Sequence, residues 1–285
     1  MQEFPHVQYL TSDGLTLRAD AGGRDEAPLV ILLHGGGQTR HSWSGAMRTL
    51  VDAGYRVINF DARGHGESDW SAVGDYELDA RGRDLATVVG DHVGPVALVG
   101  ASMGGMTSFY AVGHAMIKHV RALILVDIVL SPAAEGVGKI ERFMKEHVDG
   151  FATLDEAADA VAAYNPQRPR PGDPTGLMKN LRLNDDGRLY WHWDPRMLDI
   201  EPNPDTPDWT DQLLAVSDKV CVPTLLIRGG KSDIVDDEGV TEMCRLVPQT
   251  EVLDVAGAGH MVAGDKNDAF NSGVIDFLER HMPAA

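Results

Sequence analysis

Cysteine is scarce in this chain, which has two cysteines among 285 residues. Cys221 and Cys244 have neither the close spacing of a metal or redox motif nor the density of a disulfide-bonded scaffold. We therefore expect both to be reduced, buried thiols, and the sequence offers no metal-binding motif.

Long apolar runs are also missing. No apolar run approaches the roughly 18 residues that a membrane-spanning helix needs. The first residues, MQEFPHVQYLTSDG, lack the basic start and apolar core of a secretory signal. These two absences predict a cytoplasmic protein that does not bind membranes.

Positive charge is in short supply. The chain has 25 Lys and Arg residues against 43 Asp and Glu residues, which gives a formal net charge of −18. Such a charge repels nucleic-acid phosphates and anionic lipids, so a basic docking face for either is not expected. The hydrophobic fraction of 43% is ordinary for a globular protein. We expect a neutral or weakly charged small molecule as partner, and the sequence leaves open whether the chain forms homo-oligomers.

Short apolar runs rich in β-branched residues recur along the chain, with helical or loop segments between them. This rhythm is typical of parallel strands that crossover helices bury on both faces. Residues 6–20 alternate around an SDG turn and predict an antiparallel hairpin. The expected fold is α/β: a mostly parallel sheet of about eight strands flanked by helices, with a last helix at 268–280. Six of the runs end at or just before His34, Asp61, Ala101, Asp127, Arg228 and Val255.

The strand rhythm stops between residues 131 and 217. Helical stretches there are separated by two proline-rich segments, and no strand signal interrupts them. Because the rhythm resumes afterwards, residues 131–217 predict a helical cap over the carboxyl ends of the strands, and residues 1–130 and 218–285 form the core. A disordered linker is the alternative, but the segment YWHWDP is too aromatic for one.

The sequence GASMGG joins a predicted strand to a predicted helix and places Ser102 in a sharp turn. Such a turn needs very small neighbours, which Gly100, Gly104 and Gly105 provide. The turn also puts Ser102 at the amino end of a helix, where the partial positive charge favours an oxyanion. We therefore predict Ser102 as a catalytic nucleophile.

A serine nucleophile needs a base and an orienting carboxylate. His260 follows the last predicted strand in a glycine-rich loop, where the chain order serine, acid, histidine requires the base. Asp233, after the preceding strand, is the predicted acid. Asp236 and Asp237 fit a helix start better, and Asp127, at another strand end, is the remaining alternative.

Developing negative charge needs two preorganised donors. The amide of Met103 is one predicted donor. The loop HGGGQ supplies the other, with Gly36 preferred and Gly37 next. Of the cap's aromatic residues 190–193, Trp191 and Trp193 are candidates for substrate contact, although such clusters also form a cap's own core.

Two histidines near these motifs are expected to be structural. His34 is predicted to hydrogen-bond within its loop. Residues 60–69, FDARGHGESD, contain Asp61, His65 and Glu67, but their spacing matches no metal-ligand pattern. We interpret this segment as a hydrogen-bonded turn.

The motifs HGGGQ, DARGHGESD, GASMGG, the SD of RGGKSDIV and GAGH, in this order, resemble the capped α/β-hydrolase superfamily. The similarity is greatest to its branch of esterases, non-haem haloperoxidases and epoxide-hydrolase-like proteins. The resemblance implies a triad of Ser102, Asp233 and His260 and no metal or organic cofactor. Epoxide hydrolases and haloalkane dehalogenases of this fold have aspartate at the elbow, so Ser102 argues against those two activities.

Three functions follow from this reading. The leading hypothesis is hydrolysis of a small to medium carboxylic ester or lactone through an acyl-enzyme. A second is carbon–carbon bond hydrolysis of a vinylogous diketone, whose carboxylates call for cationic groups. A third is a non-catalytic ligand receptor that keeps the hydrolase pocket. Arginines available for the second are Arg40, Arg168, Arg170 and Arg182.

Overall fold

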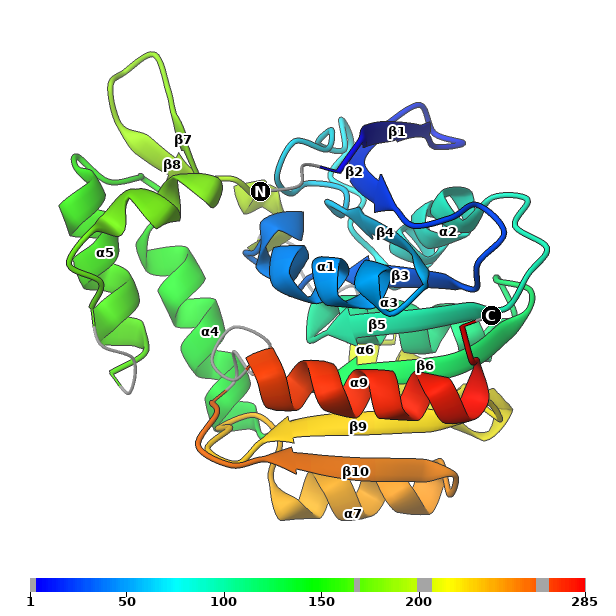
Figure 1. Ribbon diagram of the computed structural model, residues 1–285. Helices are drawn as coiled ribbons and strands as arrows, with labels where there is room; N and C mark the ends of the chain where they lie inside the picture. Colours follow the sequence, from blue (N-terminus) through cyan, green and yellow to red (C-terminus); the bar gives the residue numbers. More distant parts are fainter. Residues whose placement is uncertain (1–3, 167–169, 199–206, 260–266, 285) are drawn as a thin grey trace.

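An eight-stranded sheet forms the centre of the core in this computed structural model, which describes residues 4–166, 170–198, 207–259 and 267–284 (Figure 1). The strand order is β1-β2-β4-β3-β5-β6-β9-β10. β2 pairs antiparallel with β1 and β4, and all other neighbours are parallel. The predicted α/β class and the opening hairpin are confirmed. The strands are His6–Leu10 (β1), Thr16–Gly22 (β2), Leu29–Leu33 (β3), Arg56–Phe60 (β4), Val96–Ala101 (β5), Val120–Val126 (β6), Thr224–Gly229 (β9) and Thr250–Val255 (β10).

Helices cover both faces of the sheet, which explains the continuous apolar runs. In β5, Leu98 packs into the cluster that includes residues of α2 and α3, whereas Val99 packs into the cluster that includes residues of α1 and α9. Figure 1 shows α1 and α9 in front of the sheet. Burial on both faces removes the polar positions that a half-exposed strand would carry. The helices are Ser44–Asp52 (α1), Leu78–Val89 (α2), Met103–Gly113 (α3), Asp237–Leu246 (α7) and Asn267–His281 (α9), with the short helix Arg40–Trp43 (η1) before α1.

Both cysteines are free, but the prediction that they are buried was wrong. Cys221 is exposed because it lies in the loop just before β9. Cys244 is partly exposed on α7, whose buried face is formed by Gly239 and Met243.

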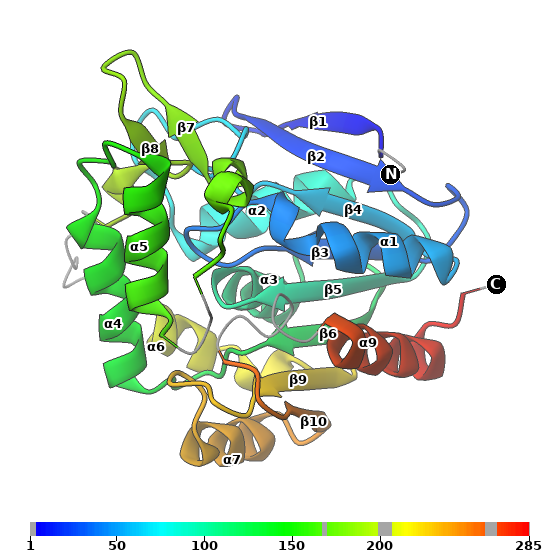
Figure 2. The ribbon, with the colours of Figure 1, turned by 60° about the vertical axis from the view of Figure 1, so that its left-hand side comes forward.

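The cap inserts between β6 and β9 and lies beside the carboxyl ends of the strands (Figures 1 and 2). It contains one feature that the sequence did not predict, a two-stranded hairpin, so the cap is not purely helical. Leu181 pairs with Trp191 and Leu183 with Leu189. Strands of three residues are too short to give a recognisable alternation. The cap elements are Ala134–Glu146 (α4), Leu154–Tyr164 (α5), Pro174–Lys179 (η2), Leu181–Leu183 (β7), Leu189–Trp191 (β8), Pro195–Leu198 (η3), Trp209–Leu214 (α6) and Ser217–Lys219 (η4).

The cap is joined to the core by main-chain hydrogen bonds. The Gly66 amide donates to the His192 carbonyl at 2.7 Å, and the Asp194 amide donates to the Gly64 carbonyl at 2.9 Å. His65 and Trp193 therefore form an isolated antiparallel bridge. We call residues 64–66 together with residues 192–194 the cap seat.

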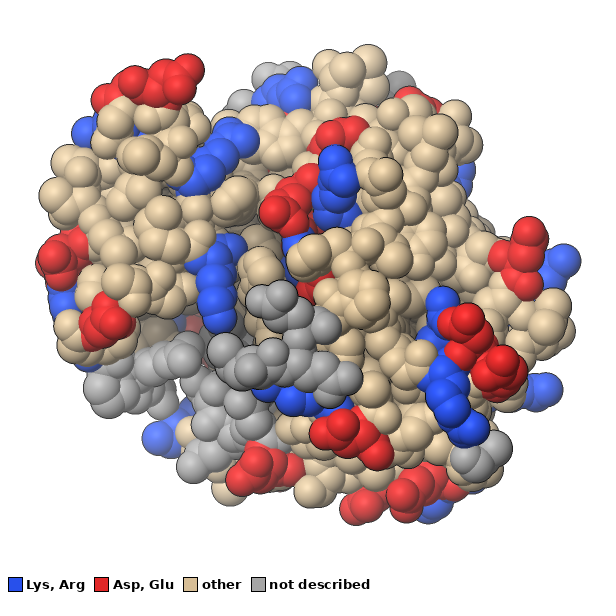
Figure 3. Space-filling view, turned by 45° about the horizontal axis from the view of Figure 1, so that its top comes forward, with Lys and Arg blue, Asp and Glu red and all other residues tan. Residues whose placement is uncertain are grey.

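The surface carries charges of both signs. Figure 3 shows Lys and Arg in small groups beside Asp and Glu on the visible face. No helix within the described ranges is both long and apolar enough to cross a bilayer.

Candidate active site

Ser102 occupies a strained turn between β5 and α3. Its φ is 45° and its ψ is −115°, a conformation that residues other than glycine rarely adopt. The Ser102 amide donates to the Val126 carbonyl at 3.1 Å, and the Met106 amide donates to the Ser102 carbonyl at 2.9 Å. The serine is thus held between the last rung of the sheet and the first turn of the helix, as the nucleophile elbow requires.

Three glycines make this turn sterically feasible. A β-carbon on Gly100 would lie 2.3 Å from the Gly104 carbonyl oxygen, and one on Gly104 would lie 2.4 Å from that of Leu33. A β-carbon on Gly105 would lie 2.5 Å from a methyl group of Ile128. The GASMGG sequence is therefore explained by close backbone packing around Ser102.

We expect Gly104→Ala to destabilise the fold by about 3 kcal/mol, because the new methyl group would meet backbone atoms that cannot rotate away. The gain from alanine in a helix, about 1 kcal/mol, is too small to compensate. Urea unfolding monitored by circular dichroism measures the effect. Gly172→Ala is the matched control, since nothing lies within 4 Å of its added carbon. Equal unfolding midpoints for the two variants would contradict the packing argument.

The predicted oxyanion donors lie beside the elbow. A β-carbon on Gly36 would be 4.0 Å from that of Met103, and both residues line one cavity with Ser102. Met103 is the first residue of α3, so its amide has no acceptor within the helix. The Gly37 amide instead donates to Nε2 of His65 at 3.1 Å. This contact leaves Gly36 as the better candidate for the second donor.

His34 and residues 60–69 form the hydrogen-bonded structures predicted for them. His34 Nδ1 bonds the Gly35 carbonyl at 2.8 Å, and its Nε2 accepts from the Ala62 amide at 3.0 Å. The buried Asp61 carboxylate accepts from the Arg40 amide at 2.7 Å and also pairs with the Arg40 guanidinium. Burial is the largest influence on His34 and lowers its pKa.

The two candidate acids have very different surroundings. Asp233 has an exposed side-chain fraction of 45%, and its Oδ2 lies 2.8 Å from Nζ of Lys139 on α4. Asp127 is completely buried and accepts from the Gly229 amide at 3.0 Å and from the Ser232 hydroxyl at 2.6 Å. Its φ is 51°, so it shares with Ser102 a left-handed backbone at a strand end.

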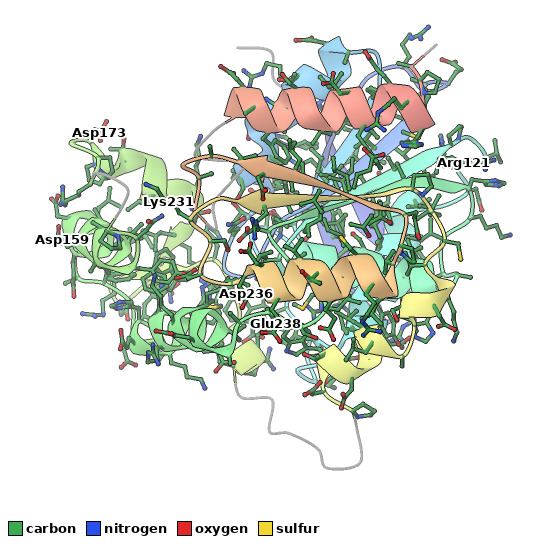
Figure 4. The ribbon with its side chains drawn as sticks, turned by 90° about the horizontal axis from the view of Figure 1, so that it is seen from below. Arg121, Asp159, Asp173, Lys231, Asp236 and Glu238 are labelled. Carbon is green, nitrogen blue, oxygen red and sulfur yellow. The ribbon has the colours of Figure 1, made fainter. Side chains whose placement is uncertain are left out.

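Asp127 also lies next to Ser102 along the sheet edge. Ala101 at the end of β5 pairs with Val126 at the end of β6, so the next residue on each strand is Ser102 or Asp127. Asp233 belongs to the loop after β9, which faces the cap; Figure 4 shows its neighbours Lys231 and Asp236 on that side, with Arg121 at the opposite end of the sheet. The assignment of Asp233 as the acid stays a prediction.

His260 lies outside the described residues, but the chain that leads to it is described. The Lys231 amide donates to the Ala258 carbonyl at 2.9 Å. A β-carbon on Gly229 would come within 2.3 Å of the Gly259 carbonyl oxygen. Gly259 therefore packs against Gly229, whose amide binds Asp127.

A cavity of about 660 Å³ lies between core and cap, with Ser102 in its wall. Trp191 and Trp193 line it and also belong to the cap's apolar cluster with Phe151 and Leu181. Each tryptophan thus belongs to the cap's own core and faces the cavity, and substrate contact by either stays a prediction.

Helices α4 and α5 also line this cavity, a contribution that was not predicted from the sequence. On α4 the lining positions include Val137, Ile140 and Met144, and on α5 they include Ala158 and Ala162. Both sets follow the spacing of one helix face, so the periodicity held a signal. The periodicity does not show which part of the protein this helix face contacts.

The described lining has little free positive charge. Its one arginine, Arg170, is paired with Asp155 at 2.6 Å and with Asp159 at 2.5 Å, and Glu141 and Asp173 are also in the wall. Burial raises the pKa of the lining Tyr164 to about 12, so this phenol is neutral at pH 7. The cavity is thus suited to an uncharged, largely apolar ligand.

Comparison with known proteins agrees with the motifs and the fold. A model of the alpha/beta hydrolase fold matches residues 28–266. Esterase Rv0045c of Mycobacterium tuberculosis is 30% identical over 249 residues, covering 84% of this chain and 79% of that protein. Its crystal structure matches with a TM-score of 0.77 at 26% identity, over 98% of this chain and 93% of that one. The structure of E-2-(acetamidomethylene)succinate hydrolase has a TM-score of 0.83 at 22% identity, over 97% and 99% of the two chains, and shows a shared fold. The resemblance indicated by the motifs is confirmed.

Proposed function

Because the chain belongs to the alpha/beta hydrolase family, we propose that it is an esterase that cleaves a small to medium, uncharged carboxylic ester or lactone through an acyl-enzyme. The observation that carries the proposal is Ser102 in its strained turn, in the wall of a largely apolar cavity. The 30% identity to a mycobacterial esterase supports the same activity.

The proposed reaction begins at the ester carbonyl carbon. Ser102 Oγ attacks while His260 takes its proton, and the amides of Gly36 and Met103 stabilise the oxyanion. The proton then passes from His260 to the leaving alkoxide, and the alcohol departs. Water, activated by His260, attacks the acyl-enzyme and releases the acid.

The acid of the triad has two candidates. The sequence favours Asp233, but the contacts favour Asp127, because a triad carboxylate works from a buried, hydrogen-bonded position. The packing of Gly259 on Gly229 supports the same choice, since the residue before His260 approaches the strand end that binds Asp127. We therefore propose Asp127 for this role and keep Asp233 as the alternative.

The test of the proposed function is a series of p-nitrophenyl acetate, butyrate and octanoate. Each methylene buried on apolar walls contributes about 0.8 kcal/mol, roughly a fourfold gain, so kcat/KM should rise from acetate to butyrate. A fluorophosphonate should form an adduct on the peptide that contains Ser102. Failure to hydrolyse any ester, together with no adduct, would favour the non-catalytic receptor.

Carbon–carbon bond hydrolysis is the second candidate reaction. Its substrates carry carboxylates, and the paired state of Arg170 in the described lining argues against it. Of the other arginines considered, Arg40 is bound to Asp20, Asp61 and Glu67, and Arg168 lies outside the described residues. We expect a ring-cleavage product to decay much more slowly than the preferred ester, as followed by absorbance.

The cavity face of α5 should limit acyl-chain length. Ala162 lines the cavity, so Ala162→Phe should fill part of it and lower the octanoate-to-acetate ratio of kcat/KM by about tenfold. Ala163, the next residue, is exposed, and Ala163→Phe is the matched control. A ratio that changes equally in both variants would mean that α5 does not bound the acyl site.

A further inference from the structure

His65 is a fully buried histidine between the oxyanion loop and the cap. Its Nε2 accepts a hydrogen bond from the Gly37 amide at 3.1 Å. Its main chain forms the antiparallel bridge to Trp193 of the cap. One residue therefore contacts both the loop that carries Gly36 and the cap.

The partners of His65 determine its tautomer. Nδ1 lies 3.2 Å from the Arg63 carbonyl, which can only accept, so Nδ1 carries the proton. Nε2 is then the bare nitrogen that the Gly37 amide requires. Burial, and next the nearby His34, hold the pKa of His65 well below its usual value, which keeps the imidazole neutral.

We propose that His65 is a positioning residue for the oxyanion hole: it ties the Gly35–Gly37 loop to the cap, so that the Gly36 amide points at the reacting carbonyl. The proposal rests on the proposed esterase function. It assigns His65 no contact with substrate.

The turn that carries His65 is rigid enough for this role. Gly64 and Gly66 have φ of 74° and 56°, and β-carbons there would lie 2.6 Å from the Tyr76 ring and 2.2 Å from Cγ of Asp61. The turn is therefore packed tightly on both sides of the imidazole.

The cap side of the contact is fixed as well. The Tyr76 hydroxyl donates to the buried Asp194 carboxylate, which Arg196 also binds at 2.5 Å. The His192 ring bonds the Gly66 carbonyl at 3.1 Å. His65 thus has a fixed frame from which to hold the loop.

The expected effect on catalysis follows from the short distance over which an oxyanion donor must act. An oxyanion donor acts at about 2.7 to 3.1 Å, and loss of one such donor costs on the order of 10²-fold or more in kcat. Gly36 and Gly37 are adjacent, so releasing the Gly37 amide lets the Gly36 peptide move. Substrate binding depends on the cavity walls and should change little.

Two substitutions test the roles of the two His65 nitrogens separately. The Asn in His65→Asn can still donate to the Arg63 carbonyl but is too short to reach Gly37. The Gln in His65→Gln places an acceptor oxygen near the position of Nε2. We expect His65→Asn to lower kcat on p-nitrophenyl butyrate by about 30-fold with KM within about threefold, and His65→Gln to recover most of the loss.

A trifluoromethyl ketone with a butyl chain gives a direct readout. Ser102 Oγ adds to its carbonyl, His260 takes the serine proton, nothing leaves, and the oxyanion formed occupies the predicted hole. His65→Asn should weaken this inhibitor by about the same factor as kcat/KM. The matching secondary alcohol, which forms no oxyanion, should bind equally well to both proteins. Loss of packing alone would weaken both ligands or only lower the melting temperature.

The outcomes separate this proposal from the proposed function. If the wild type hydrolyses esters and His65→Asn has the same kcat and the same ketone affinity, the positioning role is overturned and the esterase function stands. Equal losses in His65→Asn and His65→Gln would overturn it too, since the acceptor would then be irrelevant. If the wild type neither turns over esters nor binds the ketone, both proposals fail. If His65→Asn does not fold, His65→Leu replaces it with the same expectations.

Discussion

Replacing Ser102 with alanine should lower ester hydrolysis by several orders of magnitude. The substitution removes the atom that attacks the carbonyl, and only the weak catalysis supplied by the oxyanion donors and binding remains. The rate on p-nitrophenyl butyrate measures the loss, and mass spectrometry should show that the fluorophosphonate adduct disappears with it. KM is not informative here, because little turnover remains.

The control for this experiment comes from the same helix. Ser108 on α3 is fully buried, and its hydroxyl donates to the Gly104 carbonyl at 2.8 Å. Ser108→Ala removes a hydroxyl without touching the cavity, so its activity should stay close to wild type. Retention of wild-type rates in Ser102→Ala would refute the proposed mechanism.

The second large effect is expected from Asp127. Asp127→Asn keeps the size of the side chain but removes the negative charge that would stabilise the imidazolium of His260, so kcat should fall by about 10³ to 10⁴-fold. Asp233→Asn weakens a half-exposed ion pair with Lys139, and pairs of this kind contribute about 0 to 1 kcal/mol. We expect its kcat to remain within about tenfold of wild type.

These two variants control for each other. Thermal unfolding of both shows whether the loss in Asp127→Asn is only structural, since the carboxylate also accepts from Gly229 and Ser232. A folded Asp127→Asn with high activity beside an inactive Asp233→Asn would reverse the assignment and restore the reading taken from the sequence.

The core and the elbow could be predicted because local patterns determine them. Buried parallel strands require continuous apolar runs, and the turn at Ser102 requires glycine at Gly100 and Gly104. Both requirements concern residues that are close together in the sequence. The final helix was predicted within one residue of its observed ends for the same reason.

The choice of acid could not be made from the chain alone. Asp127 and Asp233 both follow predicted strands, and parallel strands bring their carboxyl ends to one edge. The direction of each side chain depends on tertiary contacts: the Gly229 amide and the Ser232 hydroxyl turn toward Asp127, whereas Lys139 of the cap binds Asp233. The hairpin of the cap and the cavity face of α5 escaped prediction because they too depend on partners distant in sequence.

The cap seat has a consequence for how this enzyme can change over generations. Its two hydrogen bonds join main-chain atoms of residues 64–66 and 192–194, and main-chain groups form such bonds without help from the side chains that face the cavity. Ala162 of α5 faces the cavity but lies outside the cap seat, so it can be exchanged without moving the cap away from Ser102. Substitutions there can change substrate preference while the main-chain register between cap and catalytic edge is kept.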